Sequence, residues 1–146
     1  MILVVLDVNV LISAIISRAG HPHQLLVAWL AGRFELATSD HIVNEVVAKL
    51  RLPRIARRYN LKGRDATWVI ALLRWRATLV HVPPQEILAV TGDPEDDAVL
   101  AVVRLCGAAY LVTGDKGLLP LGTYGDATIV TPRAFLDILG STPATP

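Results

Sequence analysis

The chain has 146 residues, of which 53% are hydrophobic and 18% charged, and its formal net charge is +1. This length predicts one domain with a hydrophobic core, and the apolar composition excludes an intrinsically disordered chain. The longest apolar stretch, residues 1–16, is too short to span a bilayer and is interrupted by Asp7 and Asn9, so we expect no membrane association. The single cysteine, Cys106, excludes an internal disulfide and a cysteine-built zinc site, which favours a cytoplasmic protein.

Short aliphatic runs alternate with amphipathic segments along the chain. Residues 2–6 form a continuous aliphatic run, typical of a strand buried on both faces of a parallel sheet. Ser39 and Asp93 have the position of helix N-caps, and Pro94 that of a first helical residue. In chain order we expect a strand at 2–6, helices at 10–16 and 23–31, a strand at 34–37, a helix at 40–52, two basic helices within 54–76, a strand at 79–82, a helix at 94–105, strands at 109–113 and 128–130, and a helix at 132–139.

This alternation of strands and helices predicts an α/β fold, a single domain with a central, short parallel sheet flanked by helices. We expect the domain to occupy residues 1–140 and residues 141–146 to form a frayed C-terminal tail. In open parallel sheets, ligands bind in the crevice at the carboxyl ends of the strands. Functional side chains are therefore expected directly after the strands.

Three acidic residues occupy this edge of the expected sheet. Asp7 directly follows the first strand, Asp115 follows the strand at 109–113, and Asp97 lies in the first turn of the helix at 94–105. Carboxylates brought together without a counter-charge repel one another and raise each other's pKa. A hard divalent cation resolves this conflict, because Mg²⁺ and Mn²⁺ prefer carboxylate and water oxygens. The pattern therefore predicts a site for one or two such ions.

Each acid also has a structural interpretation. Asp7 has the position of an N-cap for the helix that follows, and Asp115 that of a turn residue after a glycine. Asp93 is interpreted as an N-cap rather than as a metal ligand. Glu45 lies opposite the apolar face of its helix and precedes Lys49 by one helical turn, so an ion pair explains it at least as well as a catalytic role.

Basic residues gather in one part of the chain. Nine lie between residues 49 and 76 against one acid, whereas the acids are densest at 93–97. A basic lobe beside an acidic cluster suits a protein that grips a polyanion on one surface and holds metal on another, although a solvated helical face explains the basic run equally well. Trp68 and Trp75, one heptad apart, are interpreted as packing residues or as contacts with a partner helix. The candidate phosphate contacts are Arg54, Arg57 and Arg58.

Four segments of the chain, taken in order, resemble motifs of the PIN-domain family. They are Val5–Leu11, with Asp7 and Asn9; Asn44–Leu50, with Glu45; Asp93–Ala101, with Asp96 and Asp97; and Leu111–Asp115, with Thr113 and Asp115. The closing segment, Thr131–Leu136, is similar to the strand–helix junction of a bacterial subfamily. The resemblance extends from residue 3 to about residue 139, which is essentially the whole expected domain.

The resemblance implies specific roles for these residues. The implied catalytic and metal-binding residues are Asp7, Glu45, Asp97 and Asp115. Asn9 and Thr113 would support them, and Asp96 would become the ligand if the register shifted by one residue. Many members are toxins of toxin–antitoxin modules, so the resemblance implies a Mg²⁺- or Mn²⁺-dependent endoribonuclease that cuts RNA, is held in check by a protein antitoxin and forms a homodimer.

Two alternatives come from other functional classes. One is a non-catalytic PIN-fold module that binds RNA or protein, against which the four intact acids argue. The other is a phosphatase of a similar α/β type, as in the haloacid dehalogenase group. The segment Asp7-Val8-Asn9 lacks the second Asp that an aspartyl-phosphate mechanism of that group requires. The nuclease is therefore the favoured prediction.

Overall fold

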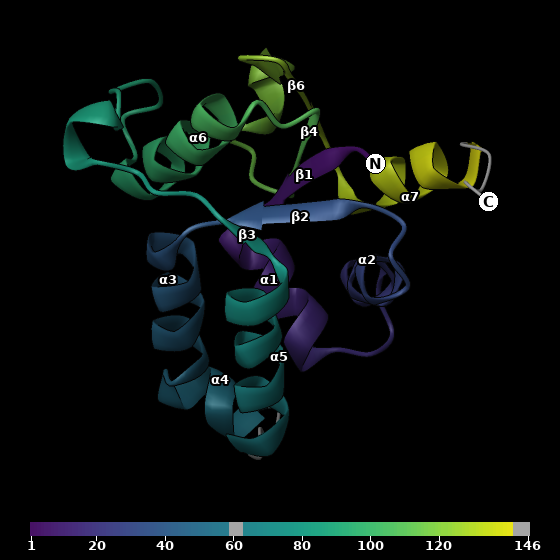
Figure 1. The fold of residues 1–146 in the computed structure, drawn as a ribbon. Coiled ribbons are helices and arrows are strands. Elements are labelled where there is room, and N and C mark those ends of the chain that lie inside the picture. The colour runs from purple at the N-terminus through teal and green to yellow at the C-terminus, as the bar shows by residue number, and fades with distance from the viewer. Residues whose placement is uncertain (59–62, 142–146) are drawn as a thin grey trace.

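A six-stranded sheet with the strand order β3-β2-β1-β4-β6-β5 forms the centre of the fold (Figure 1). The computed structural model describes residues 1–58 and 63–141. The strands are β1 (Leu3–Leu6), β2 (Glu35–Thr38), β3 (Thr78–Leu79), β4 (Tyr110–Val112), β5 (Thr123–Tyr124) and β6 (Ala127–Val130). Neighbouring strands pair in parallel except β5 and β6, which form an antiparallel hairpin at one edge. The first strand, β1, therefore lies beside β4 in the middle of the sheet.

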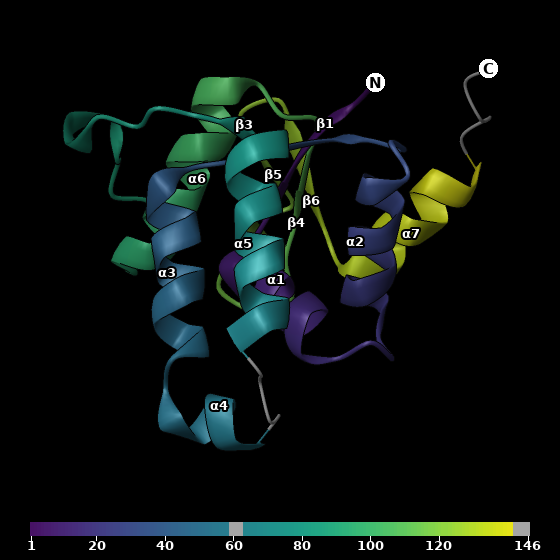
Figure 2. The same cartoon turned by 60° about the horizontal axis from the view of Figure 1, so that its bottom comes forward.

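Helices cover both faces of this sheet. They are α1 (Val8–Ile16), α2 (His21–Leu30), α3 (Asp40–Leu50), α4 (Pro53–Arg58), α5 (Gly63–Arg76), α6 (Pro94–Cys106) and α7 (Pro132–Ser141), with short 3₁₀ turns η1 (Pro84–Glu86) and η2 (Leu119–Leu121). Helices α1, α2, α3 and α5 lie on one face and α6 on the other, while α7 packs beside α2 (Figures 1 and 2). This layering explains why the middle strands have no polar face.

The core follows from the apolar runs of the sequence. Val4, Val5 and Leu6 of β1 are at most 1% exposed, because helices cover both faces of their strand. Helix α6 is buried over residues 98–103, which agrees with its nearly continuous apolar sequence. Ser39 caps α3, since its Oγ accepts a hydrogen bond from the backbone N–H of Ile42 at 3.1 Å. The apolar runs of the sequence, the Ser39 cap and the pattern of burial therefore favour the same fold.

The predicted α/β fold with a central parallel sheet is confirmed, but some elements differ in detail. The strand expected at 79–82 is shortened to β3, and β5 was not expected at all. Helix α2 begins at His21 rather than after Pro22, because proline fits the first helical turn, where its missing N–H is not needed. Helix α7 extends through Ser141, and residues 142–146 of the expected tail lie outside the described residues.

The tryptophans have different environments. Trp29 is buried, as a packing residue must be, but Trp68 and Trp75 on α5 are 58% and 89% exposed. The interpretation of these two as packing residues is therefore wrong, and a surface role remains. Among the helices that the structure describes, none combines the length and apolar character needed to cross a membrane.

Candidate metal centre

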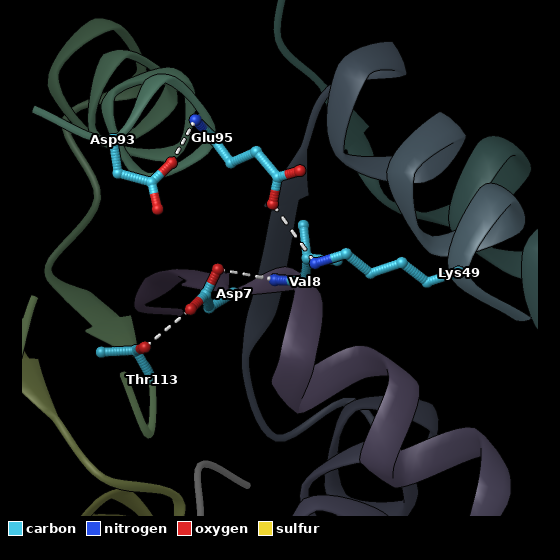
Figure 3. Close-up of polar contacts among 6 residues, drawn as sticks. All are labelled: Asp7, Val8, Lys49, Asp93, Glu95 and Thr113. Atoms are coloured by element: carbon cyan, nitrogen blue, oxygen red, sulfur yellow. Dashed lines mark hydrogen bonds and ion pairs between the residues drawn. The ribbon is translucent and has the colours of Figure 1, made fainter. Parts of the chain in front are cut away.

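Asp7 lies where β1 ends and α1 begins, at the carboxyl edge of the sheet. Its Oδ1 accepts a hydrogen bond from the backbone N–H of Val8 at 2.8 Å, so Asp7 does cap α1 as one interpretation suggested. Its Oδ2 accepts a second bond from the hydroxyl of Thr113 at 2.7 Å (Figure 3). The side chain is only 4% exposed. Capping therefore occupies one oxygen and leaves the carboxylate fixed and oriented.

Asp115 follows β4, the neighbour of β1, and is held by the same threonine. The backbone N–H of Asp115 donates to Thr113 Oγ1 at 3.0 Å, and Asp115 Oδ1 accepts from the Gly117 N–H at 2.6 Å. The Thr113 hydroxyl thus donates to Asp7 and accepts from Asp115. One buried hydroxyl fixes both segments relative to each other.

Asp96, in the first turn of α6, completes a three-residue acidic cluster. One carboxylate oxygen from each of Asp7, Asp96 and Asp115 lies within 4.8 Å of the others. Asp93 caps α6 as predicted, since its side chain accepts from the Glu95 N–H at 2.9 Å. The helix start therefore aims Asp96 at the edge of the sheet.

Burial and nearby negative charge raise the pKa of two acids of the cluster, Asp96 and Asp7. The pKa of Asp96 is raised from 3.8 to about 7, first by burial and then by the nearby charges of Asp115, Asp93 and Asp7. The pKa of Asp7 is also raised, mainly by burial, although the hydrogen bonds from Thr113 and Val8 and the charge of Lys49 oppose the shift. Without a metal ion, the negative charge of the cluster is therefore not balanced by the positive charge nearby.

Asp97 faces a different environment from Asp96. Its Oδ1 accepts hydrogen bonds from the Thr91 N–H at 2.8 Å, the Thr91 hydroxyl at 2.9 Å and the Val90 N–H at 3.2 Å. These donors, the Thr91 N–H first, lower the pKa of Asp97. The resemblance assigned the ligand to Asp97, but the structure brings Asp96 into the cluster and uses Asp97 to hold the segment before α6. Successive helical residues point about 100° apart, so both cannot face the same centre.

Lys49 of α3 supplies positive charge beside the acidic cluster. Lys49 Nζ lies 3.3 Å from Glu95 Oε2, and this ion pair connects α3 to α6 (Figure 3). Glu45 precedes Lys49 by one helical turn and is half-buried. Among the described residues, the group of acids within 4.8 Å of one another does not include Glu45. Lys49 therefore pairs with an acid on another helix rather than with Glu45.

Gly117 allows the cluster to close, a role that the sequence analysis missed. A Cβ atom at this position would lie 3.2 Å from Asp115 Oδ1 and 3.3 Å from Asp96 Oδ2. Any side chain at residue 117 would push against both carboxylates. The glycine two residues after a candidate acid is the signal that was available.

The remaining predicted residues lie around the cluster. Asn9 is exposed on α1 and lines an open pocket together with Asp115. Arg54 and Arg57 are exposed on α4, which directly follows α3. The backbone of Arg58 ends that helix, but its side chain is outside the part of the chain that is described. The side chains of Arg54 and Arg57 are therefore accessible to solvent or to a ligand.

The donor chemistry of the cluster fits a hard divalent cation. The three groups are all carboxylates, which suit Mg²⁺ and Mn²⁺, and no histidine or cysteine joins them in the described residues. A cation would remove the repulsion that raises the pKa of Asp96. The residues present therefore fit the ion that the sequence pattern predicted.

Comparisons with known proteins agree with this geometry. The sequence model of the family described as PIN domain matches residues 3–117, a range that includes all three clustered acids. An uncharacterised protein of Methanocaldococcus jannaschii is 32% identical over 118 residues, which cover 81% of this chain and 74% of that protein. The crystal structure of FitAcB from Neisseria gonorrhoeae has a TM-score of 0.52 and 18% identity, covers 89% of this chain and 98% of that chain, and shows likeness of fold alone. The chain therefore belongs to the PIN-domain family.

Proposed function

We propose that this protein is a metal-dependent endoribonuclease that hydrolyses phosphodiester bonds in RNA. The observation that carries the proposal is the convergence of Asp7, Asp96 and Asp115, whose oxygens lie within 4.8 Å of one another. Strongly perturbed carboxyl groups that gather at the ligand-binding edge of a sheet favour a functional site over a structural one. A non-catalytic binding module would gain nothing from maintaining this repulsion.

The three clustered acids would hold Mg²⁺ or Mn²⁺. When bound, such an ion supplies Lewis-acid chemistry, neutralising charge on phosphate oxygens and activating water. Thr113 orients Asp7 and the segment that carries Asp115. Asp97 keeps the start of α6 in place through Thr91. The chain thus prepares the positions of the acids before any ion arrives.

Glu45 is proposed as a fourth acid that acts from α3. Its support is the resemblance of its segment to the family motif and its place one turn before Lys49, whose charge acts on Asp7. Residues one turn apart on a helix share a face. The proposed catalytic set is therefore Asp7, Glu45, Asp96 and Asp115, with Asn9 in support.

Lys49 and the exposed arginines of α4 are the proposed phosphate contacts. Lys49 already lies beside the acidic cluster, and Arg54 and Arg57 continue the positive charge onto the next helix. A single-stranded nucleic acid bound along α4 and α3 would have its phosphate backbone directed toward the acidic cluster. RNA is the proposed substrate, in the cytoplasm, where the single cysteine of the chain would stay reduced.

We further infer that the protein is the toxin of a toxin–antitoxin module and forms a homodimer. The family resemblance supports both inferences. The exposed Trp68 and Trp75 on α5 support a macromolecular contact, because large aromatic side chains are enriched at protein interfaces. Light scattering of wild type and of a Trp75→Ser variant tests the dimer. A variant with the same molar mass as a dimeric wild type would show that the interface does not involve this face of α5.

The test of the nuclease is an assay on end-labelled single-stranded RNA and DNA with Mg²⁺, Mn²⁺ or EDTA. We expect metal-dependent cleavage of RNA that falls by orders of magnitude in Asp7→Asn and Asp96→Asn. The matched control is Asp97→Asn, which changes the neighbouring acid and should retain far more activity. Cleavage by Asp7→Asn at the wild-type rate, or wild-type cleavage in EDTA, would show that this mechanism is wrong. Metal-dependent RNA binding with no cleavage would favour the non-catalytic module.

A further inference from the structure

An open pocket adjoins the acidic cluster, and its lining comes from α1, α2, the segment after β4 and the start of α7. Its volume is about 230 Å³, and four separate segments of the chain form it. Asp115 belongs both to this pocket and to the acidic cluster, so an occupant would lie next to the proposed reaction centre. The lining residues are Asn9, Val10, Ser13, Pro22, Gly114, Asp115 and Pro132.

The lining combines apolar walls with a few polar groups. Val10, Pro22 and Pro132 are apolar, whereas Asn9 and Ser13 offer an amide and a hydroxyl. Across residues 1–58 and 63–141, neither of these polar side chains has a hydrogen-bond partner within the protein. The amide can donate and accept at once, and the hydroxyl can do either. A flat, apolar ligand with polar edges would satisfy both kinds of wall.

The electrostatics of the pocket favour electronegative but uncharged groups. Helices α2 and α7 begin at the pocket, and neither has an acidic residue in its first turn, whereas Asp7 caps α1. The N-terminal N–H groups of α2 and α7 carry partial positive charge. The Asp115 carboxylate in the same lining opposes an anionic phosphate. Carbonyl oxygens and ring nitrogens of a nucleobase meet both conditions.

We propose that this pocket receives the base of a nucleotide that flanks the cleaved phosphodiester bond. The proposal rests on the proposed nuclease function and adds a specificity site to it. Single-stranded RNA is recognised through bases that leave the stack and bind in pockets by stacking and edge hydrogen bonds. The pocket includes Asp115 but neither Asp7 nor Asp96, so we assign it one position of the substrate beside the cut, with Asn9 and Ser13 as the residues that contact the base edge.

Substitutions at Ser13 test the pocket without changing the acids. Ser13→Leu fills the pocket from α1, whereas Ser13→Ala removes only the hydroxyl and is the matched control. Pro22→Ala is a second variant, which removes an apolar wall without filling the space. The Mn²⁺-induced rise in melting temperature, measured for every variant, reports whether fold and metal centre are intact.

The first measurement is the pattern of cut sites in a random-sequence RNA library. We expect wild type and Ser13→Ala to prefer one or two bases at a single position beside the cut, and Ser13→Leu to lose that preference. Pro22→Ala should weaken it. An unchanged preference in Ser13→Leu, or a wild type with no preference at any flanking position, would overturn the pocket assignment while leaving the nuclease in place.

The second measurement does not depend on cleavage. Titration of the Mn²⁺-loaded protein with the four nucleoside 5′-monophosphates and with ribose 5-phosphate isolates the contribution of the base. At least one nucleotide should bind about five-fold or more tightly than ribose 5-phosphate, the lower end for a stacked base, and Ser13→Leu should abolish this difference. Equal binding by wild type would overturn the base site. A base-dependent difference in a protein that cleaves no RNA would instead refute the nuclease and retain the site.

Discussion

Replacement of Asp96 by Asn removes the most perturbed carboxyl group of the centre at almost constant volume. Because the pKa of Asp96 is raised from 3.8 to about 7 in the folded protein, folded Asp96 keeps a proton that the unfolded chain has released. The metal-free protein therefore loses stability as pH rises from about 4 to about 7, and the loss is complete above that range. Asn cannot ionise, so the variant avoids this loss.

The size of the effect follows from the pKa. At about 1.4 kcal/mol per pKa unit, the rise from 3.8 to about 7 corresponds to a ceiling of about 4 kcal/mol in the free energy of unfolding. Water and salt at the open side of the centre screen part of this repulsion, so we expect about half, or about 2 kcal/mol. In a domain of this size, that difference raises the melting temperature by about 4–8 °C.

The assay is thermal unfolding in EDTA between pH 5 and pH 8.5, repeated with Mn²⁺. In EDTA, Asp96→Asn should melt above wild type, and its advantage at pH 8 should be at least about twice that at pH 5. With Mn²⁺ at one hundred times its dissociation constant, wild type should gain about 2.7 kcal/mol and the order should reverse.

The control is Asp97→Asn, for which we expect the melting temperature to change in the opposite direction. The pKa of Asp97 is lowered by the Thr91 and Val90 donors, so its charge stabilises the folded state above pH 4, and the variant should melt below wild type in EDTA. Its Mn²⁺ response should remain. If Asp96→Asn melts no higher than wild type above pH 7, or Asp97→Asn loses the Mn²⁺ response, the division of roles between these neighbours is wrong.

Three further variants have defined outcomes. Gly117→Ala should push the two nearest carboxylates apart and weaken Mn²⁺ binding at least about ten-fold in a titration followed by melting temperature; unchanged affinity would mean that the loop yields freely. Glu95→Gln releases Lys49 from a partly exposed ion pair, so stability should change by less than about 1 kcal/mol while RNA binding tightens, and weaker binding would contradict a phosphate role for Lys49. Replacing Arg54 and Arg57 by Ala should lower the slope of log affinity against log salt by about 0.7 per lost contact, and an unchanged slope would mark α4 as a solvated face.

The sequence was sufficient to locate two of the three clustered acids. The aliphatic runs before Asp7 and Asp115 predict buried strands, and parallel strands bring their carboxyl ends to one edge. The choice between Asp96 and Asp97 could not be made this way. One residue rotates a helical side chain by about 100°, and the orientation of α6 depends on the bonds from Thr91, which no periodicity reveals.

Other features could not be predicted from the sequence, because they arise from contacts between distant segments of the chain. Gly117 matters only because Asp96, on α6, approaches the same space as Asp115, which follows β4. The short strand β5 is too short for an alternation pattern, yet Gly125 and the residue after it form the two-residue turn of a hairpin, and Gly125 has a φ of 57°. That dipeptide was the available signal for the antiparallel edge.

The bond from Thr113 to Asp7 also bears on the order of events during synthesis. Asp7 leaves the ribosome long before Thr113, which orients it and which follows α6 and β4 in the chain. Pairing of β1 with β4 closes a long loop, so it is entropically costly and comes late. A nascent chain that has not reached Asp115 therefore carries isolated acids and no assembled centre. A nuclease built in this order would remain inactive toward the message and the ribosome that are producing it until most of its domain has emerged.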